Sequence, residues 1–250
     1  MSRVIKTILS VVVMLLVSYQ GIFAAARNSS NYSIQSDSIN FSGGFSTSAS
    51  FEQESTLGEV ATGPSSSSSF NIKAGYQQMQ TVYLAITTAA NVTLSPSING
   101  TIAGTANGST SVTATTDNVA GYELYIKASS SPALISGSNS FADYTPSGAN
   151  PDFTFSVGAT ASEFGFTPEG ADVVQKYLDD GVSCNTGAGD TADSCWSGLS
   201  TTNDLIVQKL TANQPSGTPT TLKFRAENGS SNLQSAGNYT ATATVTLLAR

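Results

Sequence analysis

Residues 237–248 alternate strictly between apolar and polar positions. One parity holds Tyr239, Ala241, Ala243, Val245 and Leu247, and the other holds Thr240, Thr242, Thr244 and Thr246. Such alternation puts all the apolar side chains on one face of a β-strand. We therefore predict one long strand here, around which the chain is organised and whose apolar face a second sheet must cover.

Residues 121–129 show the second-clearest alternation. Tyr122, Leu124, Ile126 and Ala128 share one face, and Glu123, Tyr125 and Lys127 share the other. Shorter runs predict further strands at 80–88, 91–94, 109–116, 152–157, 163–166, 205–209 and 220–225. Together these segments predict an all-β fold, an antiparallel two-sheet sandwich of immunoglobulin-like or jelly-roll-like kind, over residues 81–250.

The strand signals thin out between residues 130 and 216, which we interpret as a loop-and-helix insertion. Thr167-Pro168-Glu169 has the composition of a helix start, with a capping residue, a proline and an acidic first turn. Apolar residues follow at helical spacing until Gly181. The pattern predicts one short helix over about 168–179.

A Ser-rich repeat precedes the sandwich and occupies residues 27–80. Its aromatic residues Tyr32, Phe51 and Phe70 are each 19 positions apart, and Gly44 and Gly63 follow an aromatic by 12 positions. We interpret each unit as a β-hairpin that turns back at its glycine, a small stacking or surface module. A Ser-rich linker with chance periodicity is the alternative.

Residues 1–26 have the pattern of a secretory signal peptide. Arg3 and Lys6 precede an apolar run at 8–17, and Ala24-Ala25-Ala26 offers a cleavage site. The run is shorter than the roughly 20 residues of a transmembrane helix. We expect a secreted, extracellular or cell-surface protein that meets the membrane only through this leader.

The composition agrees with an exported β protein and argues against two classes of partner. Charged residues make up 11% of the chain, which has 22 glycines, no histidine and a net charge of −7. Few charges with many glycines and hydroxyl side chains are typical of many-stranded secreted proteins. The negative charge argues against nucleic acid and anionic membranes as partners.

Three segments also resemble a known group. Residues 116–124, 141–146 and 236–240 resemble uncharacterised secreted β-sandwich proteins of bacteria, including candidate-phylum lineages. The resemblance extends over about residues 80–250. It implies an exported all-β protein and assigns no activity and no site residues.

Cys184 and Cys195 are the only cysteines. In an exported chain, a close pair is most simply a disulfide. A redox or metal-binding thiol pair is the alternative, but the spacing is not C-x-x-C and the chain has no histidine. We predict a structural bridge, which stabilises the fold by about 3 kcal/mol through closure of its loop.

The segment around these cysteines carries two candidate binding features. Its aspartates offer hard oxygen ligands for calcium, although the spacing of a calcium loop is absent. They are Asp179, Asp180, Asp190 and Asp193. Trp196, the only tryptophan, is a candidate platform for stacking on a sugar, with packing in a sandwich core as the alternative.

Catalysis has little support in the sequence. Without histidine there is no Ser-His-Asp or Cys-His system and no histidine-bound zinc. A glycosidase-like carboxylate pair remains an option, with Glu163 and Glu169 as the best candidates. We predict a non-enzymatic structural or adhesive protein, without a cofactor, that binds cell-surface or extracellular components. A glycan- or calcium-binding module is the alternative, and a polysaccharide hydrolase is a third class.

Self-association is a further expectation. The final strand, residues 239–248, has neither charge nor proline. If it lies at a sheet edge, its free backbone groups invite another chain, with the Ser-rich module as one donor. If it is central and paired on both sides, the protein is a monomer.

Overall fold

A computed structural model describes residues 82–250 and six short stretches before them, 27–28, 33–34, 42–47, 52–58, 63–66 and 71–74. The chain divides into two compact units, Met1–Thr81 and Val82–Arg250. The expected signal peptide, residues 1–26, lies outside the described residues.

The described stretches of the N-terminal unit form three antiparallel strand pairs. They are β1 (Arg27–Asn28) with β2 (Ser33–Ile34), β3 (Ser42–Thr47) with β4 (Glu52–Leu57), and β5 (Gly63–Ser66) with β6 (Asn71–Ala74). Gly44 lies inside β3 and Gly63 begins β5, so the expected turning points are wrong. The aromatics of the repeat, Tyr32, Phe51 and Phe70, lie outside the described residues.

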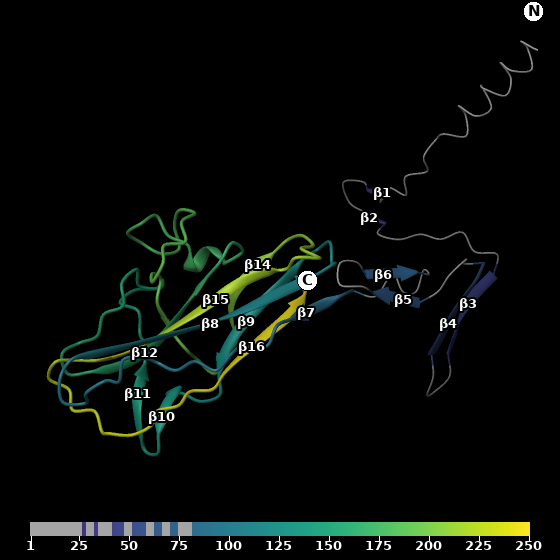
Figure 1. Cartoon of the computed structure of the whole chain (residues 1–250). Helices are drawn as coiled ribbons and strands as arrows, with labels where there is room; N and C mark the ends of the chain where they lie inside the picture. Colours follow the sequence, from purple (N-terminus) through teal and green to yellow (C-terminus); the bar gives the residue numbers. More distant parts are fainter. Residues whose placement is uncertain are drawn as a thin grey trace, which may run out of the picture. The chain divides into compact units, whose positions relative to one another are not determined.

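The C-terminal unit contains a seven-stranded sheet, and Figure 1 shows its long strands β8, β12 and β15. The spatial order is β10, β11, β12, β15, β8 and β7, and β13 also pairs with β12. The bounds are β7 Leu84–Ile86, β8 Gly104–Thr116, β10 Leu134–Ser136, β11 Asn139–Asp143, β12 Ser162–Glu169, β13 Ser197–Gly198 and β15 Thr218–Asn228.

This larger sheet is mixed, so the prediction of purely antiparallel sheets is wrong. Strands β11 and β12 run parallel, while the other pairs in the sheet are antiparallel. Parallel neighbours need a long connection that returns the chain to the starting end of the first strand. Residues 144–161, between β11 and β12, form that connection.

A smaller, antiparallel sheet has the order β14, β9, β16. These strands are β14 (Asp204–Lys209), β9 (Tyr122–Ala128) and β16 (Ala243–Ala249). The alternation predicted for residues 121–129 is confirmed, because the four apolar residues of β9 are buried and the intervening ones are partly exposed.

Side chains of both sheets pack into one hydrophobic core. The larger sheet contributes Val112, Ala114, Phe164, Phe166, Leu222, Phe224 and Ala226, and the smaller contributes Tyr122, Leu124, Ile126, Ala128, Ile206 and Val207. Burial of apolar area on this scale is the main stabilising term of a folded domain. The all-β prediction is confirmed for the described residues.

The final strand is shorter and less central than predicted. Tyr239 and Thr240 precede β16, and Thr240 forms an isolated bridge with Ile135 of β10. The chain then passes to the smaller sheet, where β16 pairs with β9. The alternating stretch is therefore divided between two sheets, and its apolar residues Val245 and Leu247 are only partly buried.

The segment 130–216 is not an insertion, because it supplies β12 at the centre of the larger sheet and β14 of the smaller one. The expected helix at 168–179 is also wrong. Thr167, Pro168 and Glu169 belong to β12, where they pair with β15. Only a 3-10 turn, Gln175–Tyr177, follows.

Two shorter predictions also fail. The segments 91–94 and 152–157 form no strands. Isolated bridges occur instead at Ser95, just after the first segment, which pairs with Asn107, and at Asp152, which pairs with Trp196. Among the described residues, no helix has the length and apolar character needed to span a membrane.

Candidate functional site

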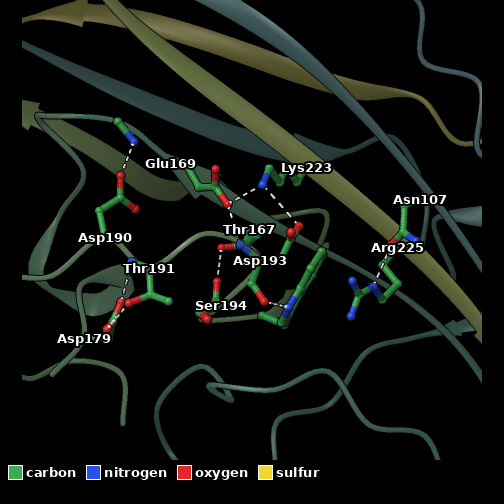
Figure 2. Close-up of polar contacts among 12 residues, drawn as sticks. Asn107, Thr167, Glu169, Asp179, Asp190, Thr191, Asp193, Ser194, Lys223 and Arg225 are labelled. Atoms are coloured by element: carbon green, nitrogen blue, oxygen red, sulfur yellow. Dashed lines mark hydrogen bonds and ion pairs between the residues drawn. The ribbon is translucent and has the colours of Figure 1, made fainter. Parts of the chain in front are cut away.

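A linked group of polar contacts lies on the face of β12 and β15 that is turned away from the core (Figure 2). Because side chains alternate along a strand, this outer face carries the residues between those that enter the core. They are Glu163, Gly165, Thr167 and Glu169 of β12, and Thr221, Lys223, Arg225 and Glu227 of β15. The loop of residues 179–196, which contains both cysteines, is bonded to this face.

Lys223 is the central cation of the group. Figure 2 shows its ammonium between two carboxylates, with Nζ 2.8 Å from Oε1 of Glu169 and 3.2 Å from Oδ1 of Asp193. Partial burial opposes the charge of Lys223, but the hydrogen bonds to these two carboxylates outweigh it and raise the pKa of the lysine. Lys223 therefore ties the loop to two strands of the sheet.

Hydrogen bonds from uncharged donors reinforce this tie. The N–H of Asp193 donates to Oε1 of Glu169 (2.7 Å), and the buried hydroxyl of Thr167 donates to the carbonyl of Ser194 (2.6 Å). Asp193 and Cys195 have φ of 58° and 61°, a left-handed conformation that non-glycine residues adopt only where the surroundings hold them. The loop thus has one fixed path across the sheet.

Asp179 anchors the other end of the loop and is buried, with 1% of its surface exposed. Its Oδ1 accepts hydrogen bonds from the N–H of Gly181 and the hydroxyl of Thr191, both at 2.8 Å, and its Oδ2 accepts one from the N–H of Thr191 at 2.9 Å. Burial favours the neutral acid, but these donors outweigh it and lower the pKa of Asp179. The ionised carboxylate organises the loop.

Two other carboxyl groups near this face have a raised pKa. Desolvation raises the pKa of Asp190, and Glu169 and Asp179 add to the shift, although Gly170 donates its N–H to the carboxylate. Burial likewise raises the pKa of Glu163, with further contributions from Asp152 and from Glu227 directly opposite on β15. The fold therefore disfavours the ionised form of both carboxyl groups, through desolvation first and through neighbouring carboxylates second.

The opposite shifts predict opposite effects of neutral substitution. Because the pKa of Asp179 is lowered on folding, its ionisation stabilises the fold above the unfolded value of about 4 and this contribution is lost in acid. Because the pKa of Glu163 is raised, its charge destabilises the fold at neutral pH. We expect Asp179→Asn to lower the unfolding midpoint in urea at neutral pH, and Glu163→Gln to raise it.

Both differences should shrink in acid: that of Glu163→Gln as the pH falls through the raised pKa of Glu163, and that of Asp179→Asn only as the pH falls below about 4, toward the lowered pKa of Asp179. Glu227→Gln is the matched control for Glu163, since it removes the facing charge and leaves Glu163 in place. An Asp179→Asn variant as stable as wild type at neutral pH would contradict this account of the loop.

Trp196 is a core residue, with 1% of its surface exposed. Its ring packs edge-on against Phe155 (centroids 5.3 Å apart), the guanidinium of Arg225 lies 4.6 Å from its centroid, and its indole N–H donates to the carbonyl of Asp193. A buried ring has no face open to a sugar. The structure therefore contradicts the candidate stacking role and agrees with the packing alternative for Trp196.

Tyr144, Phe155 and Trp196 form a small core of their own, the aromatic cluster. Gly165 of β12 leaves room for it. A Cβ atom on Gly165 would lie 2.8 Å from the carbonyl oxygen of Ser197 and 2.9 Å from side-chain atoms of Phe155 and Tyr144. The cluster can lie close against the sheet only because this position has no side chain.

We expect Gly165→Ala to lower the free energy of unfolding by about 1–3 kcal/mol, the usual cost of overpacking. Gly148→Ala is the matched control, because a Cβ there has no neighbour within 4 Å. Thermal denaturation of both variants measures the difference. Equal stability of the two variants would contradict the close contact at Gly165.

The four aspartates proposed as calcium ligands are engaged separately. Asp179 bonds within its own loop, Asp180 accepts from the N–H groups of Val182 and Ser183, and Asp190 and Asp193 bond to Gly170 and Lys223. No group of three or more acidic or cysteine side chains in the described part of the chain is arranged to hold a metal ion. Calcium binding stays a prediction, tested by calorimetric titration with Ca²⁺.

The carboxylates proposed as a catalytic pair, Glu163 and Glu169, lie six positions apart on one strand, roughly 20 Å along it. Glycosidase carboxylates are separated by about 5–9.5 Å. The facing pair is Glu163 and Glu227, which sequence reasoning missed. Lys223 was also missed, and no local sequence signal marks it.

Comparison with known proteins identifies no relative. No protein-family description, no curated protein and no solved structure matches this chain.

Proposed function

We propose that this protein is an exported, non-catalytic structural or adhesive component of the cell surface or extracellular space. We infer further that its two sheets form a sandwich that displays the loops and edges by which it contacts other components. The loop of residues 179–196, which is tied to the outer face of the larger sheet, supports such a role.

The observation that carries the proposal is the use of the polar groups on the outer face of β12 and β15. Lys223, Glu169 and Asp193 form one linked group, and Asp179 is saturated by donors from its own loop. Groups arranged in this way hold a loop in place. A structural use of these groups favours a structural role of the protein over a catalytic one.

The disulfide supports the proposed compartment. Cys184 and Cys195 are bonded, with Cα atoms 5.5 Å apart, which confirms the predicted bridge. Disulfides form and persist mainly in oxidising compartments outside the cytoplasm. The bridge thus agrees with export by the predicted leader.

Localisation and activity together test the proposal. Antibody labelling of intact cells, with permeabilised cells as control, should detect the protein on the surface or in the medium. Labelling only after permeabilisation would contradict export. Hydrolysis of any member of a polysaccharide panel, lost in Glu163→Gln or Glu227→Gln, would contradict the non-catalytic role.

A further inference from the structure

We propose that the outer face of the smaller sheet binds an acidic polysaccharide, with Tyr125 as the platform for a sugar ring and Lys127 as the partner of its carboxylate. This inference deepens the adhesive role proposed above and rests on it. It names the chemical class of the partner and the residues that contact it.

The outer face of the smaller sheet is the face turned away from the core, and β9 lies at its centre. Directly opposite residues of neighbouring strands lie on the same face of a sheet. The rows of this face are Gln208, Glu123 and Leu248; Leu205, Tyr125 and Thr246; and Lys127 with Thr244. Each of these residues is exposed or partly exposed. Tyr125 therefore lies at the centre of an open face, surrounded by amide, hydroxyl and charged groups.

The ring of Tyr125 is positioned by its hydroxyl group, which donates to Oε2 of Glu123 at 2.7 Å. Nε2 of Gln208 donates to the other carboxylate oxygen at 2.9 Å, and Nε of Arg250 lies 3.3 Å from it. These contacts, led by the bond from Tyr125, lower the pKa of Glu123 and keep it ionised. Among the described residues, no second aromatic ring and no cation contacts the ring of Tyr125. A ring held in this way loses little freedom when a ligand stacks on it.

Lys127 differs from the other cationic side chains of residues 82–250 in having no partner within the described part of the chain. The ones that form ion pairs with carboxylates are Lys176, Lys209, Lys223 and Arg250. Arg225 lies over the ring of Trp196 and donates to Asn107. The ammonium group of Lys127 is therefore available to an anion from outside the molecule.

These groups match the chemistry of a sugar. One face of a pyranose ring consists of C–H groups, which pack on an aromatic ring, and the hydroxyl groups at its edge need hydrogen-bond partners. Tyr125 supplies the ring, and the hydroxyl groups of Thr244 and Thr246 supply polar partners on the neighbouring strand. Tyr125 and Lys127 are two positions apart, roughly 7 Å along the strand, so one sugar unit can contact both.

Charge selects an acidic sugar over a neutral one. The chain has a net charge of −7, but charges farther apart than about 8 Å are largely screened at physiological ionic strength. The nearest carboxylate on the strand, Glu123, is already paired with Arg250. Lys127 thus attracts a carboxylate locally, and a neutral sugar would leave its charge unused.

A peptide fits this face less well than a sugar does. Extended peptides bind sheets mainly through unpaired backbone groups at an edge strand. Strand β9 pairs with β14 on one side and with β16 on the other, so its backbone groups are used within the sheet. Recognition at its centre depends on side chains, and an aromatic ring beside a single cation fits a ring that carries a carboxylate.

Calorimetric titration of the full exported protein tests the ligand class. The probes are oligogalacturonate and oligoglucuronate, in buffer with EDTA so that calcium cannot bridge the carboxylates. We expect at least one of them to bind, and its affinity to fall as salt is added. The methyl esters, which keep the sugar rings and lack the charge, should bind more weakly. Polyglutamate, which has carboxylates without sugar rings, should not bind.

Variants test the two residues. Tyr125→Ala should weaken binding about tenfold through loss of the stacked ring, and Tyr125→Phe should weaken it less because the ring remains. Lys127→Met should weaken binding about two- to fivefold, the range of an exposed ion pair, and remove its salt dependence. Lys223→Met is the matched control, because it removes the same charge from the outer face of the other sheet. The buried Trp196 should keep the same emission in the Tyr125 and Lys127 variants, which checks that they fold.

The proposal would be overturned if neither acidic oligosaccharide bound at millimolar concentration. Equal affinity for the methyl esters would reject the role of charge, and equal affinity for polyglutamate would reject a sugar. Unchanged binding by folded Tyr125→Ala would place the ligand elsewhere. These measurements use purified protein, so a failure here leaves the proposed export untouched, and a protein confined to the cytoplasm would contradict export whatever the titrations show.

Discussion

Trp196→Ala is expected to lower the free energy of unfolding by about 3–5 kcal/mol, the range for deletion of a large buried aromatic side chain. The indole fills the aromatic cluster, its N–H satisfies the carbonyl of Asp193, and its face supports the guanidinium of Arg225. Substitution removes all three contacts and leaves a cavity beside β12. Urea denaturation followed by circular dichroism measures the loss.

Trp196→Phe is the control, because it keeps an apolar ring and should lose less stability than the alanine variant. The same variants distinguish packing from sugar recognition. A Trp196→Ala protein that remains as stable as wild type but loses binding on a glycan array would contradict the buried position of this residue.

The alternation of apolar residues predicted β9 correctly because one face of that strand lies entirely against the core and the other face lies outside it. Its apolar side chains enter the core, and its polar ones lie on the outside. The same pattern at residues 237–248 was overinterpreted. Alternation reports which side chains share a face, but not which sheet the strand joins, and this segment bridges β10 before it pairs with β9.

The failed helix has a comparable cause. Thr167-Pro168-Glu169 has the local chemistry of a helix start, yet pairing across all eight residues of β12 with β15 outweighs that preference. Local propensities amount to less than about 1 kcal/mol per residue for most residue types, and tertiary pairing routinely overrides them. The sequence contains no local sign of this long-range pairing.

The disulfide and the acidic loop were predictable because their residues are close together in the sequence. Lys223 was not, since its partner Asp193 is 30 positions away and Glu169 is on another strand. Only the register of β12 against β15 brings these residues together. The burial of Trp196 depends in the same way on Phe155, which is distant in the sequence and reaches the same face of the sheet.

Removal of the disulfide by Cys184→Ser with Cys195→Ser is expected to lower the free energy of unfolding by about 3 kcal/mol. The bridge closes a loop with a sequence separation of 11 residues, and without it the unfolded chain gains conformational freedom. Both cysteines also belong to the hydrophobic core. The fluorescence of Trp196, the only tryptophan and the neighbour of Cys195, reports the unfolding of this region.

The polar contacts of the loop predict how the variant without the disulfide behaves. Asp179 and Lys223 hold the loop without the bridge, so the serine variant should fold and keep a buried tryptophan spectrum while its urea midpoint falls. Adding Lys223→Met to the serine variant should then release the loop, with a red shift of the tryptophan emission under native conditions. An unchanged midpoint for the serine variant would show that the loop is held entirely by its polar contacts.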